Sequence, residues 1–183
     1  MFTVPALSNE QVTLRPFGPE DAEMVVEACN DPETQRWLPL PNPYLPEHGK
    51  TWCGGMAEEL RLAGDGLHLA FCGPGDQFAG SVSLKRTNWR TRVSEVGYWT
   101  APWMRRKGLT AEATRLLSTW ALGHGMERVE LFCAPGNIGS QRVSLAAGFE
   151  YEGRLKNAGF THSGRTDLLV YSLTNPIEPP DRA

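Results

Sequence analysis

The 183-residue sequence lacks several features that would place it in a well-defined functional class. It has no run of the roughly 18 apolar residues that a membrane-spanning helix needs. Its first residues show no charged segment followed by an apolar stretch, so no secretory signal is visible and a cytoplasmic location is expected. The Gly-x-x-x-x-Gly-Lys-Ser/Thr pattern is missing as well, which argues against a kinase-like nucleotide-binding domain.

Cysteine and histidine are few and are not spaced as metal ligands. The four cysteines form no C-x-x-C pair, and the four histidines show no ligand spacing. These spacings argue against a zinc ribbon or a dithiol redox site, and no metal site is expected. The cysteines are expected to be small buried residues in a reducing compartment. They are Cys29, Cys53, Cys72 and Cys133.

An excess of positive charge is also absent. The chain has 18 Lys and Arg against 21 Asp and Glu, a net charge of −3, which disfavours a nucleic-acid surface. Its 40% apolar and 21% charged residues are typical of a soluble globular protein. The length fits one domain, expected to span residues 1–175, with a flexible proline-rich tail at 176–183.

The pattern of apolar residues predicts a mixed α/β domain. From Leu109 to Trp120 the apolar positions are spaced by four, three, one and three residues, which is a helical face. The proline-rich stretch 32–46 shows no regular element. The order β-α-α-β-β-β-α-β-α-β-β implies a mixed sheet with helices on both faces. Predicted strands are 11–15, 67–72, 78–85, 93–100, 129–133, 149–156 and 166–173, and predicted helices are 19–29, 47–63, 109–120 and 138–147.

A cluster of cations lies between a predicted strand and the helix with this apolar face. The cluster reads Arg105-Arg106-Lys107-Gly108-Leu109-Thr110. The start of a helix has free N–H groups and the positive end of the backbone dipole, and such sites bind phosphate. Three cations and a glycine there predict that the turn holds the pyrophosphate of a nucleotide-containing cofactor. A solvated basic turn that caps the helix is the alternative.

Short motifs along most of the chain resemble the general amine N-acetyltransferase (GNAT) superfamily, and within it the Rim-type acetylases of ribosomal protein N-termini. Each motif alone is weak, but their order and spacing together are specific. The matching pieces are Glu95-Val-Gly-Tyr-Trp99, Pro102-x-x-Arg105-x-x-Gly108, Ala111-Glu-Ala113, Arg128-Val-Glu130, Asn137-x-x-Ser140-x-Arg-Val143, Gly148-Phe149, Glu152-Gly153, Gly164-x-x-Asp167 and Tyr171-Ser-Leu173.

This resemblance implies a GNAT-like fold with a splayed central strand pair. It also implies acetyl transfer from acetyl-coenzyme A to a primary amine, by direct attack in a ternary complex. The amine belongs to a protein N-terminus or to a small molecule such as a polyamine, an aminoglycoside-like antibiotic or an amino acid. Dimers are common in this branch, so a homodimer is among the implied states. A non-catalytic module that senses an acyl-coenzyme A or a peptide is the alternative function.

The resemblance also assigns the residues that hold coenzyme A. The backbone of the strand at 98–100 would pair with the pantetheine arm, its aromatic side chains being core residues. The N–H groups of the basic turn would face the pyrophosphate, which its cations neutralise. Asn137 would contact the pantetheine arm, or else only cap its helix. The assigned residues are Tyr98, Trp99, Thr100, Arg105, Arg106, Lys107, Gly108, Leu109, Thr110 and Asn137.

Two positions in the basic turn depart from the family pattern. Relatives usually have glycine where Arg106 stands, and alanine or glycine where Thr110 stands. Small residues there let backbone amides approach a phosphate oxygen closely. Arg106 is compatible with binding if its side chain points outward, and Thr110 adds a hydroxyl donor.

Two residues are candidates for the chemistry itself. Ser140 matches the family position whose hydroxyl donates to the departing thiolate, with a solvent-facing serine as the alternative. Glu95 is the best-placed carboxylate for a general base, since it shares a strand face with Gly97 and Trp99, although a paired glutamate is the alternative. Some Rim-type enzymes carry a glutamate where Gly159 stands here. Direct or water-relayed deprotonation of an amine of low pKa is therefore expected.

Overall fold

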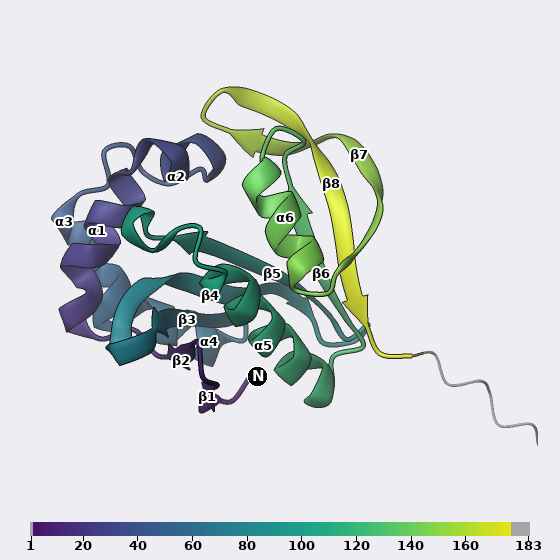
Figure 1. Ribbon diagram of the computed structural model, residues 1–183, viewed down its shortest axis with the longest axis horizontal. Coiled ribbons are helices and arrows are strands. Elements are labelled where there is room, and N and C mark those ends of the chain that lie inside the picture. The colour runs from purple at the N-terminus through teal and green to yellow at the C-terminus, as the bar shows by residue number, and fades with distance from the viewer. Residues whose placement is uncertain (1, 177–183) are drawn as a thin grey trace, which may run out of the picture.

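An eight-stranded sheet forms the centre of the molecule in the computed structural model, which describes residues 2–176 (Figure 1). The strand order is β1-β2-β3-β4-β5-β6-β8-β7. Neighbouring strands are antiparallel except β5 and β6, which are parallel, so the predicted mixed sheet is confirmed. The strands are β1 Leu7–Ser8, β2 Thr13–Arg15, β3 Gly66–Gly73, β4 Gln77–Asn88, β5 Val93–Thr100, β6 Arg128–Cys133, β7 Glu150–Thr161 and β8 Gly164–Thr174.

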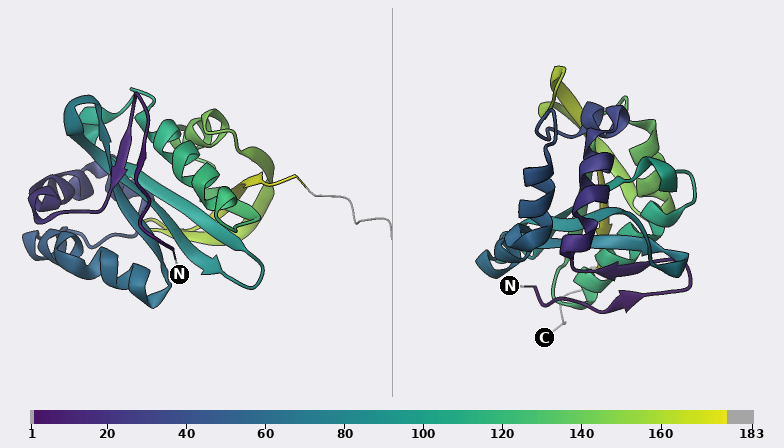
Figure 2. Two further views of the ribbon diagram at one scale, coloured as in Figure 1. Left: turned by 90° about the horizontal axis from the view of Figure 1, so that it is seen from below. Right: turned by 90° about the vertical axis from the view of Figure 1, so that its left-hand side faces the viewer.

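Helices cover both faces of the sheet, as predicted (Figure 2). Helices α1, α3 and α4 lie on one side, and α5 and α6 lie on the other. None of the helices in residues 2–176 has the length and apolar character needed to cross a membrane. They are α1 Ala22–Asn30, α2 Pro32–Trp37, α3 Pro46–Thr51, α4 Ala57–Ala63, α5 Leu109–Gly123 and α6 Ile138–Ala146.

The larger hydrophobic core lies between the sheet and α5. The apolar face predicted for this helix is confirmed, because Leu109, Ala113 and Leu117 are buried against the strands. Full burial of a leucine side chain contributes roughly 1.5–3 kcal/mol, so this stripe fixes α5 on the sheet. A smaller core beneath α1 includes Val25 and Phe78. All four cysteines are free and buried, as expected for small apolar residues.

The structure differs from the predicted elements mainly in the N-terminal half. Helix α2 was not predicted, although Asp31 caps it by accepting the Thr34 N–H at 3.0 Å and Pro32 occupies its first position. The single helix predicted over 47–63 is divided by a π-helical turn, Trp52–Met56. The two-residue strand β1 was also missed. The predicted flexible tail, 176–183, lies outside the described residues apart from Pro176.

The parallel strands β5 and β6 separate after only three paired positions. Val93, Ser94 and Glu95 pair with residues 128–130 of β6. Beyond them β5 continues to Thr100 beside β4, and β6 continues to Cys133 beside β8. The splayed central strand pair is therefore confirmed, and it opens a gap in the middle of the sheet.

The basic turn between β5 and α5 contains two residues with positive φ. Gly108 has φ of +80° and immediately precedes the first residue of α5. Arg106 has φ of +63°, in the left-handed region that favours glycine. The glycine expected at position 106 in relatives suits this backbone conformation, and the arginine here adopts it at a cost of about 1–2 kcal/mol.

We predict that Arg106→Gly raises the free energy of unfolding by up to about 1 kcal/mol, because relief of the left-handed strain exceeds the roughly 0.5–1 kcal/mol entropic cost of glycine. Lys107→Gly is the matched control, since the neighbouring residue is also exposed but has no positive φ. It should lower the same free energy by about 0.5–1 kcal/mol. Urea denaturation of both variants measures the difference, and equal losses would show that position 106 is unstrained.

Candidate functional site

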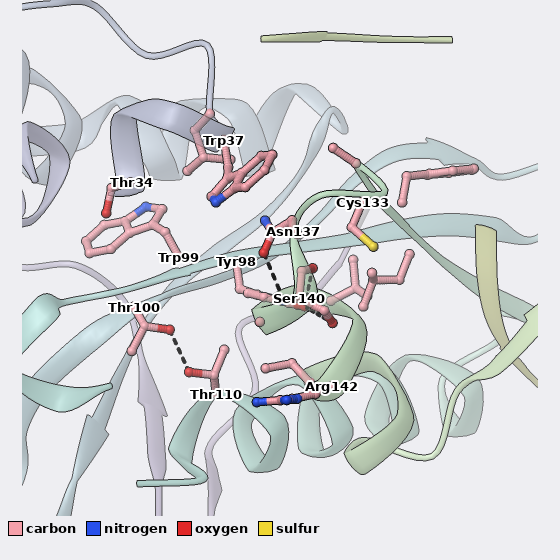
Figure 3. Close-up of a pocket in the computed structure, with 18 of the residues that line it drawn as sticks. Thr34, Trp37, Tyr98, Trp99, Thr100, Thr110, Cys133, Asn137, Ser140 and Arg142 are labelled. Carbon is pink, nitrogen blue, oxygen red and sulfur yellow. Dashed lines mark hydrogen bonds between the residues drawn. The ribbon is translucent and has the colours of Figure 1, made fainter. Parts of the chain in front are cut away.

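A cavity of about 970 Å³ occupies the gap between the diverging strands (Figure 3). Its walls come from β5, β6, α2, α6, the basic turn and the β7–β8 hairpin. Eleven of the twelve site residues predicted from the sequence line it. The exception is Leu109, whose side chain is buried in the core beneath α5, so only its backbone is available for the predicted role.

One end of the cavity is formed by the basic turn and the start of α5. The backbone N–H groups of residues 106–111 have no protein acceptor within the described part of the chain. The side chains of Arg106, Lys107 and Arg142 have no carboxylate partner there either. This end of the cavity therefore combines free N–H groups, a helix dipole and three uncompensated cations, which together attract an anion.

Arg142 was not among the residues predicted for the site. It lies on α6, and Figure 3 shows its side chain pointing toward Thr110 in the first turn of α5. The sequence did contain a signal, because the motif Asn137-x-x-Ser140-x-Arg142 places this cation two residues after Ser140. The proximity of α6 to the start of α5 is a tertiary feature and could not be derived from that spacing.

Arg105 was predicted to neutralise pyrophosphate, but its guanidinium has other partners in the structure. Nη2 donates to Asp31 and, at 3.0 Å, to Thr34 Oγ1 at the start of α2. Partial burial favours the protonated form of Asp31, yet the Arg105 guanidinium and the Thr34 N–H outweigh it and lower the pKa of Asp31. Arg105 thus connects the basic turn to α2.

Thr100 and Thr110 form a hydroxyl pair where β5 ends and α5 begins. Their Oγ1 atoms lie 2.6 Å apart (Figure 3). The Thr110 hydroxyl, predicted to add a donor in the turn, is therefore already in contact with another hydroxyl. The pair holds the end of β5 against the first turn of α5.

Tyr98 and Ser140 meet across the cavity from β5 and α6. The Tyr98 hydroxyl lies 2.8 Å from Ser140 Oγ and 3.2 Å from the Ser140 carbonyl oxygen. Burial raises the pKa of Tyr98 well above its ordinary value, so the phenol stays protonated at neutral pH. The sequence interpretation treated both aromatic side chains of the strand as core packing. It holds for Trp99, which packs on Phe78 with ring centroids 5.9 Å apart, but it missed the Tyr98 contact.

Asn137 and Ser140 open helix α6. Asn137 caps the helix by accepting the Ser140 N–H at 3.0 Å. Its side-chain N–H₂ group has no acceptor among residues 2–176, and the residue lines the cavity. Capping therefore leaves the amide nitrogen free to bind a ligand. Ser140 also lines the cavity, so it is not the solvent-facing serine of the alternative interpretation.

Cys133 lines the same cavity but shows no sign of an activated nucleophile. Burial raises the pKa of its thiol above the ordinary value. No histidine is among the residues that line the cavity, and no group of three metal-ligating side chains forms within residues 2–176. A protonated thiol without a base does not favour a covalent acyl-enzyme.

Glu95 lies at the last paired position before β5 and β6 separate. Its side chain is only 8% exposed, and its two carboxylate oxygens contact Lys85 Nζ at 3.0 Å and Arg86 Nη2 at 2.6 Å. The structure therefore shows the paired glutamate of the alternative interpretation. A Cβ added to Gly159 would lie 2.7 Å from Leu168 Cδ2, so a glutamate at that position would need a shift of Leu168.

The other end of the cavity is walled by α2 and the β7–β8 hairpin. Trp37 of α2 and Leu38, which directly follows it, contribute to this wall, and Phe160 and Leu168 contribute from the hairpin. Phe160 is 63% exposed, so this wall reaches the molecular surface. None of these four residues is among the twelve site residues predicted from the sequence.

Comparisons with known proteins agree with this geometry. The family described as "Acetyltransferase (GNAT) domain" matches residues 11–150. YdaF of Bacillus subtilis, named provisionally as a ribosomal N-acetyltransferase, is 30% identical over 173 residues, which cover 90% of this chain and 92% of YdaF. The ribosomal-protein-serine acetyltransferase of Escherichia coli is 29% identical over 98 residues, which cover 53% of this chain and 55% of that enzyme.

A solved structure supports the fold. The ribosomal alpha-N-protein acetyltransferase RimL in complex with coenzyme A superposes with a TM-score of 0.80 at 19% identity, over 93% of this chain and 97% of RimL. The family match spans most of the chain, and the YdaF match spans nearly all of it. The chain therefore belongs to the GNAT acetyltransferase family and is an acetyl-coenzyme A-dependent N-acetyltransferase close to the ribosomal-protein enzymes of the Rim type.

Proposed function

We propose that this enzyme acetylates the α-amino group of a protein N-terminus, by direct attack on acetyl-coenzyme A in a ternary complex. The observation that carries the proposal is the cavity between the splayed strands. One end offers an anion site at the start of α5, and the other end opens to the surface between α2 and the β7–β8 hairpin. Two substrates can therefore enter from separate ends and meet between β5 and β6. A small-molecule amine is the second candidate acceptor.

The residues at the anion end fit the phosphate groups of the cofactor. The free N–H groups of residues 106–111 would bind the pyrophosphate, with Arg106, Lys107 and Arg142 supplying positive charge. The backbone of residues 98–100, which has no β6 partner, would pair with the pantetheine arm. The side-chain amide of Asn137 would donate to the same arm. Acetyl-coenzyme A supplies the thioester carbonyl and the thiol leaving group.

Ser140 is the proposed proton donor to the departing thiolate. Its hydroxyl lies on the cavity wall, 2.8 Å from the Tyr98 hydroxyl. A Tyr98 phenol that stays protonated can donate to Ser140 Oγ and so support donation from Ser140. A thiol has a pKa near 8.5, so a hydroxyl donor of modest acidity is sufficient.

The acceptor amine must lose a proton before it attacks. Glu95 is the candidate base, but both of its oxygens are held by cations, so it acts through a water molecule or after one ion pair opens. Deprotonation of an α-amino group with a pKa near 8 costs only about 1 kcal/mol at pH 7, whereas a lysine amine costs nearer 5 kcal/mol. Both carboxylates that line the cavity are engaged, Glu95 by two cations and Glu33 by Trp37 Nε1, so the site favours an amine of low pKa such as a protein N-terminus.

Release of coenzyme A thiol, measured with a panel of peptides, tests the proposed function. Peptides with a free N-terminal serine or alanine should be turned over. The same peptides should be inactive when the N-terminus is blocked and a lysine is the only amine. Faster reaction of the lysine peptides would contradict the α-amine preference. Absence of turnover with every amine, despite coenzyme A binding, would instead favour a non-catalytic sensor.

We predict that Gly108→Asp weakens coenzyme A binding at least about tenfold more than Gly108→Asn, a difference near 1.4 kcal/mol. The two side chains have the same size and tolerate positive φ, and a Cβ at this position meets no atom within 4 Å, so both variants should fold. Only the aspartate places a negative charge where phosphate is expected. Isothermal titration calorimetry measures both affinities, and equal values would place the phosphates elsewhere.

We predict that Ser140→Ala lowers kcat by about tenfold or more and changes the coenzyme A Kd less than twofold, because proton donation acts in the transition state. Cys133→Ala is the matched control from the same cavity wall. It should keep near-normal kcat, since direct attack needs no thiol. Steady-state kinetics with the best peptide gives both values. Loss of activity in the cysteine variant alone would point to an acyl-enzyme.

A further inference from the structure

Helix α2 contacts both of the loops that flank the cavity. Its first turn is joined to Arg105 of the basic turn, which precedes α5. Its last residue, Trp37, lies against Gly136 in the loop that precedes α6. The two loops belong to the two strands that separate, so α2 spans the opening from the β5 side to the β6 side.

Two acceptors, Asp31 Oδ1 and Thr34 Oγ1, join the first turn of α2 to Arg105. Oδ1 of Asp31 accepts from Arg105 Nη2 and also caps α2 by accepting the Thr34 N–H at 3.0 Å. The same guanidinium nitrogen donates to Thr34 Oγ1 at 3.0 Å. The Asp31 and Arg105 side chains are only 16% and 31% exposed, so solvent screens this ion pair weakly. A shift of the basic turn therefore pulls directly on the first turn of α2.

The contact at the last turn is one of close packing. A Cβ on Gly136 would lie 3.1 Å from Trp37 Cη2, so the indole ring rests directly on the Gly136 backbone. The ring is fixed from its other side, because Trp37 Nε1 donates to Glu33 Oε1 at 2.7 Å. Gly136 immediately precedes Asn137, which caps the helix that carries Ser140.

A buried glutamine makes α2 move as a unit with its flanking segments. Gln35 Nε2 donates to the carbonyl oxygens of Cys29 at 2.7 Å and Pro41 at 2.9 Å, one before and one after the helix. The cavity-facing side of α2 carries Thr34 and Trp37, which point toward the opening in Figure 3. Displacement of α2 therefore displaces the acceptor side of the cavity.

We propose that α2 is a brace that couples the cofactor loop to the acceptor side of the cavity, with Asp31, Arg105 and Trp37 as positioning residues. Arg105 acts through Asp31 rather than as a phosphate ligand. Cofactor bound at the basic turn fixes Arg105, Arg105 fixes α2, and α2 then holds the acceptor wall next to Ser140. The expected effect on peptide kinetics rests on the function proposed above, whereas the coupling between the basic turn and α2 does not.

Hydrogen exchange of residues 32–38, measured with and without coenzyme A, tests the coupling. In the wild-type enzyme, coenzyme A should slow exchange in this segment by about fivefold or more, the size of a typical coupling between sites. Asp31→Asn removes the charge of the ion pair and should weaken that slowing, while the coenzyme A Kd changes by less than about threefold, since asparagine caps a helix as well as aspartate does. The proposal would be overturned if coenzyme A left the exchange rate of residues 32–38 unchanged in the wild-type enzyme, or slowed it equally in the variant.

Asp167→Asn is the matched control for this experiment. Asp167 also accepts one backbone N–H, from Asn157 at 2.7 Å, and one arginine, Arg154 at 2.6 Å, but it lies on the hairpin and does not line the cavity. It should retain the slowing of residues 32–38. Loss of the slowing in this variant as well would assign the effect to general destabilisation and overturn the proposal.

Peptide kinetics gives the second readout. Asp31→Asn should raise the peptide KM by about fivefold or more with the coenzyme A Kd nearly unchanged. Gly136→Ala perturbs the opposite contact, because its methyl group pushes Trp37 outward, and it should raise the same KM. Unchanged KM in both variants would overturn the proposal. If no peptide is a substrate, the hydrogen-exchange experiment still tests the coupling. Failure of the coupling proposal is therefore distinguishable from failure of the proposed function.

Discussion

The separation of β5 from β6 after Glu95 is the constraint on which the rest of the site depends. Three backbone pairs hold the strands together, and the five following residues of β5 have no partner on that side. Unpaired backbone N–H and C=O groups that face a cavity need other hydrogen-bond partners. They can bind such partners as the edge of a β-sheet does. The same separation places the two following helices on opposite sides of one opening. The free N–H groups at the start of α5 and the Ser140 hydroxyl are thereby brought to a single cavity.

Local patterns predicted the parts of the structure that depend on neighbouring residues. The apolar stripe of α5, the basic turn before it and the cap at Asn137 all lie within a few positions of their partners. The contacts between distant residues were not predicted. Tyr98 meets Ser140 across 42 positions, and Arg105 meets Asp31 across 74. Such contacts depend on how the sheet opens, which no local spacing encodes. Helix α2 is intermediate, because its cap and proline were visible but lay in a stretch that reads as irregular.

The basic turn shows how two cations next to each other in sequence serve different parts of the site. Arg105 faces an acidic cap and is neutralised within the protein, whereas Arg106 adopts a left-handed backbone and is left uncompensated. The glycine that the family pattern has at position 106 adopts a left-handed backbone without strain and carries no charge. This chain instead combines a strained backbone with an additional cation. The uncompensated charge at the start of α5 therefore comes partly from Arg106, where the family pattern has glycine, and partly from Arg142 of α6.

Glu95 links the electrostatics of the site to the choice of acceptor. Two cations hold its carboxylate, and Glu33, the other carboxylate that lines the cavity within residues 2–176, accepts from Trp37 Nε1 at 2.7 Å. At pH 7 about a tenth of an α-amino group with a pKa near 8 is already neutral, whereas for a lysine amine the neutral fraction is on the order of one in 2,500. An N-terminal amine thus needs orientation more than deprotonation, and orientation is what a rigid wall provides. The wall formed by α2, which contacts Arg105 at one end and Gly136 at the other, therefore suits an amine of low pKa better than a stronger base would.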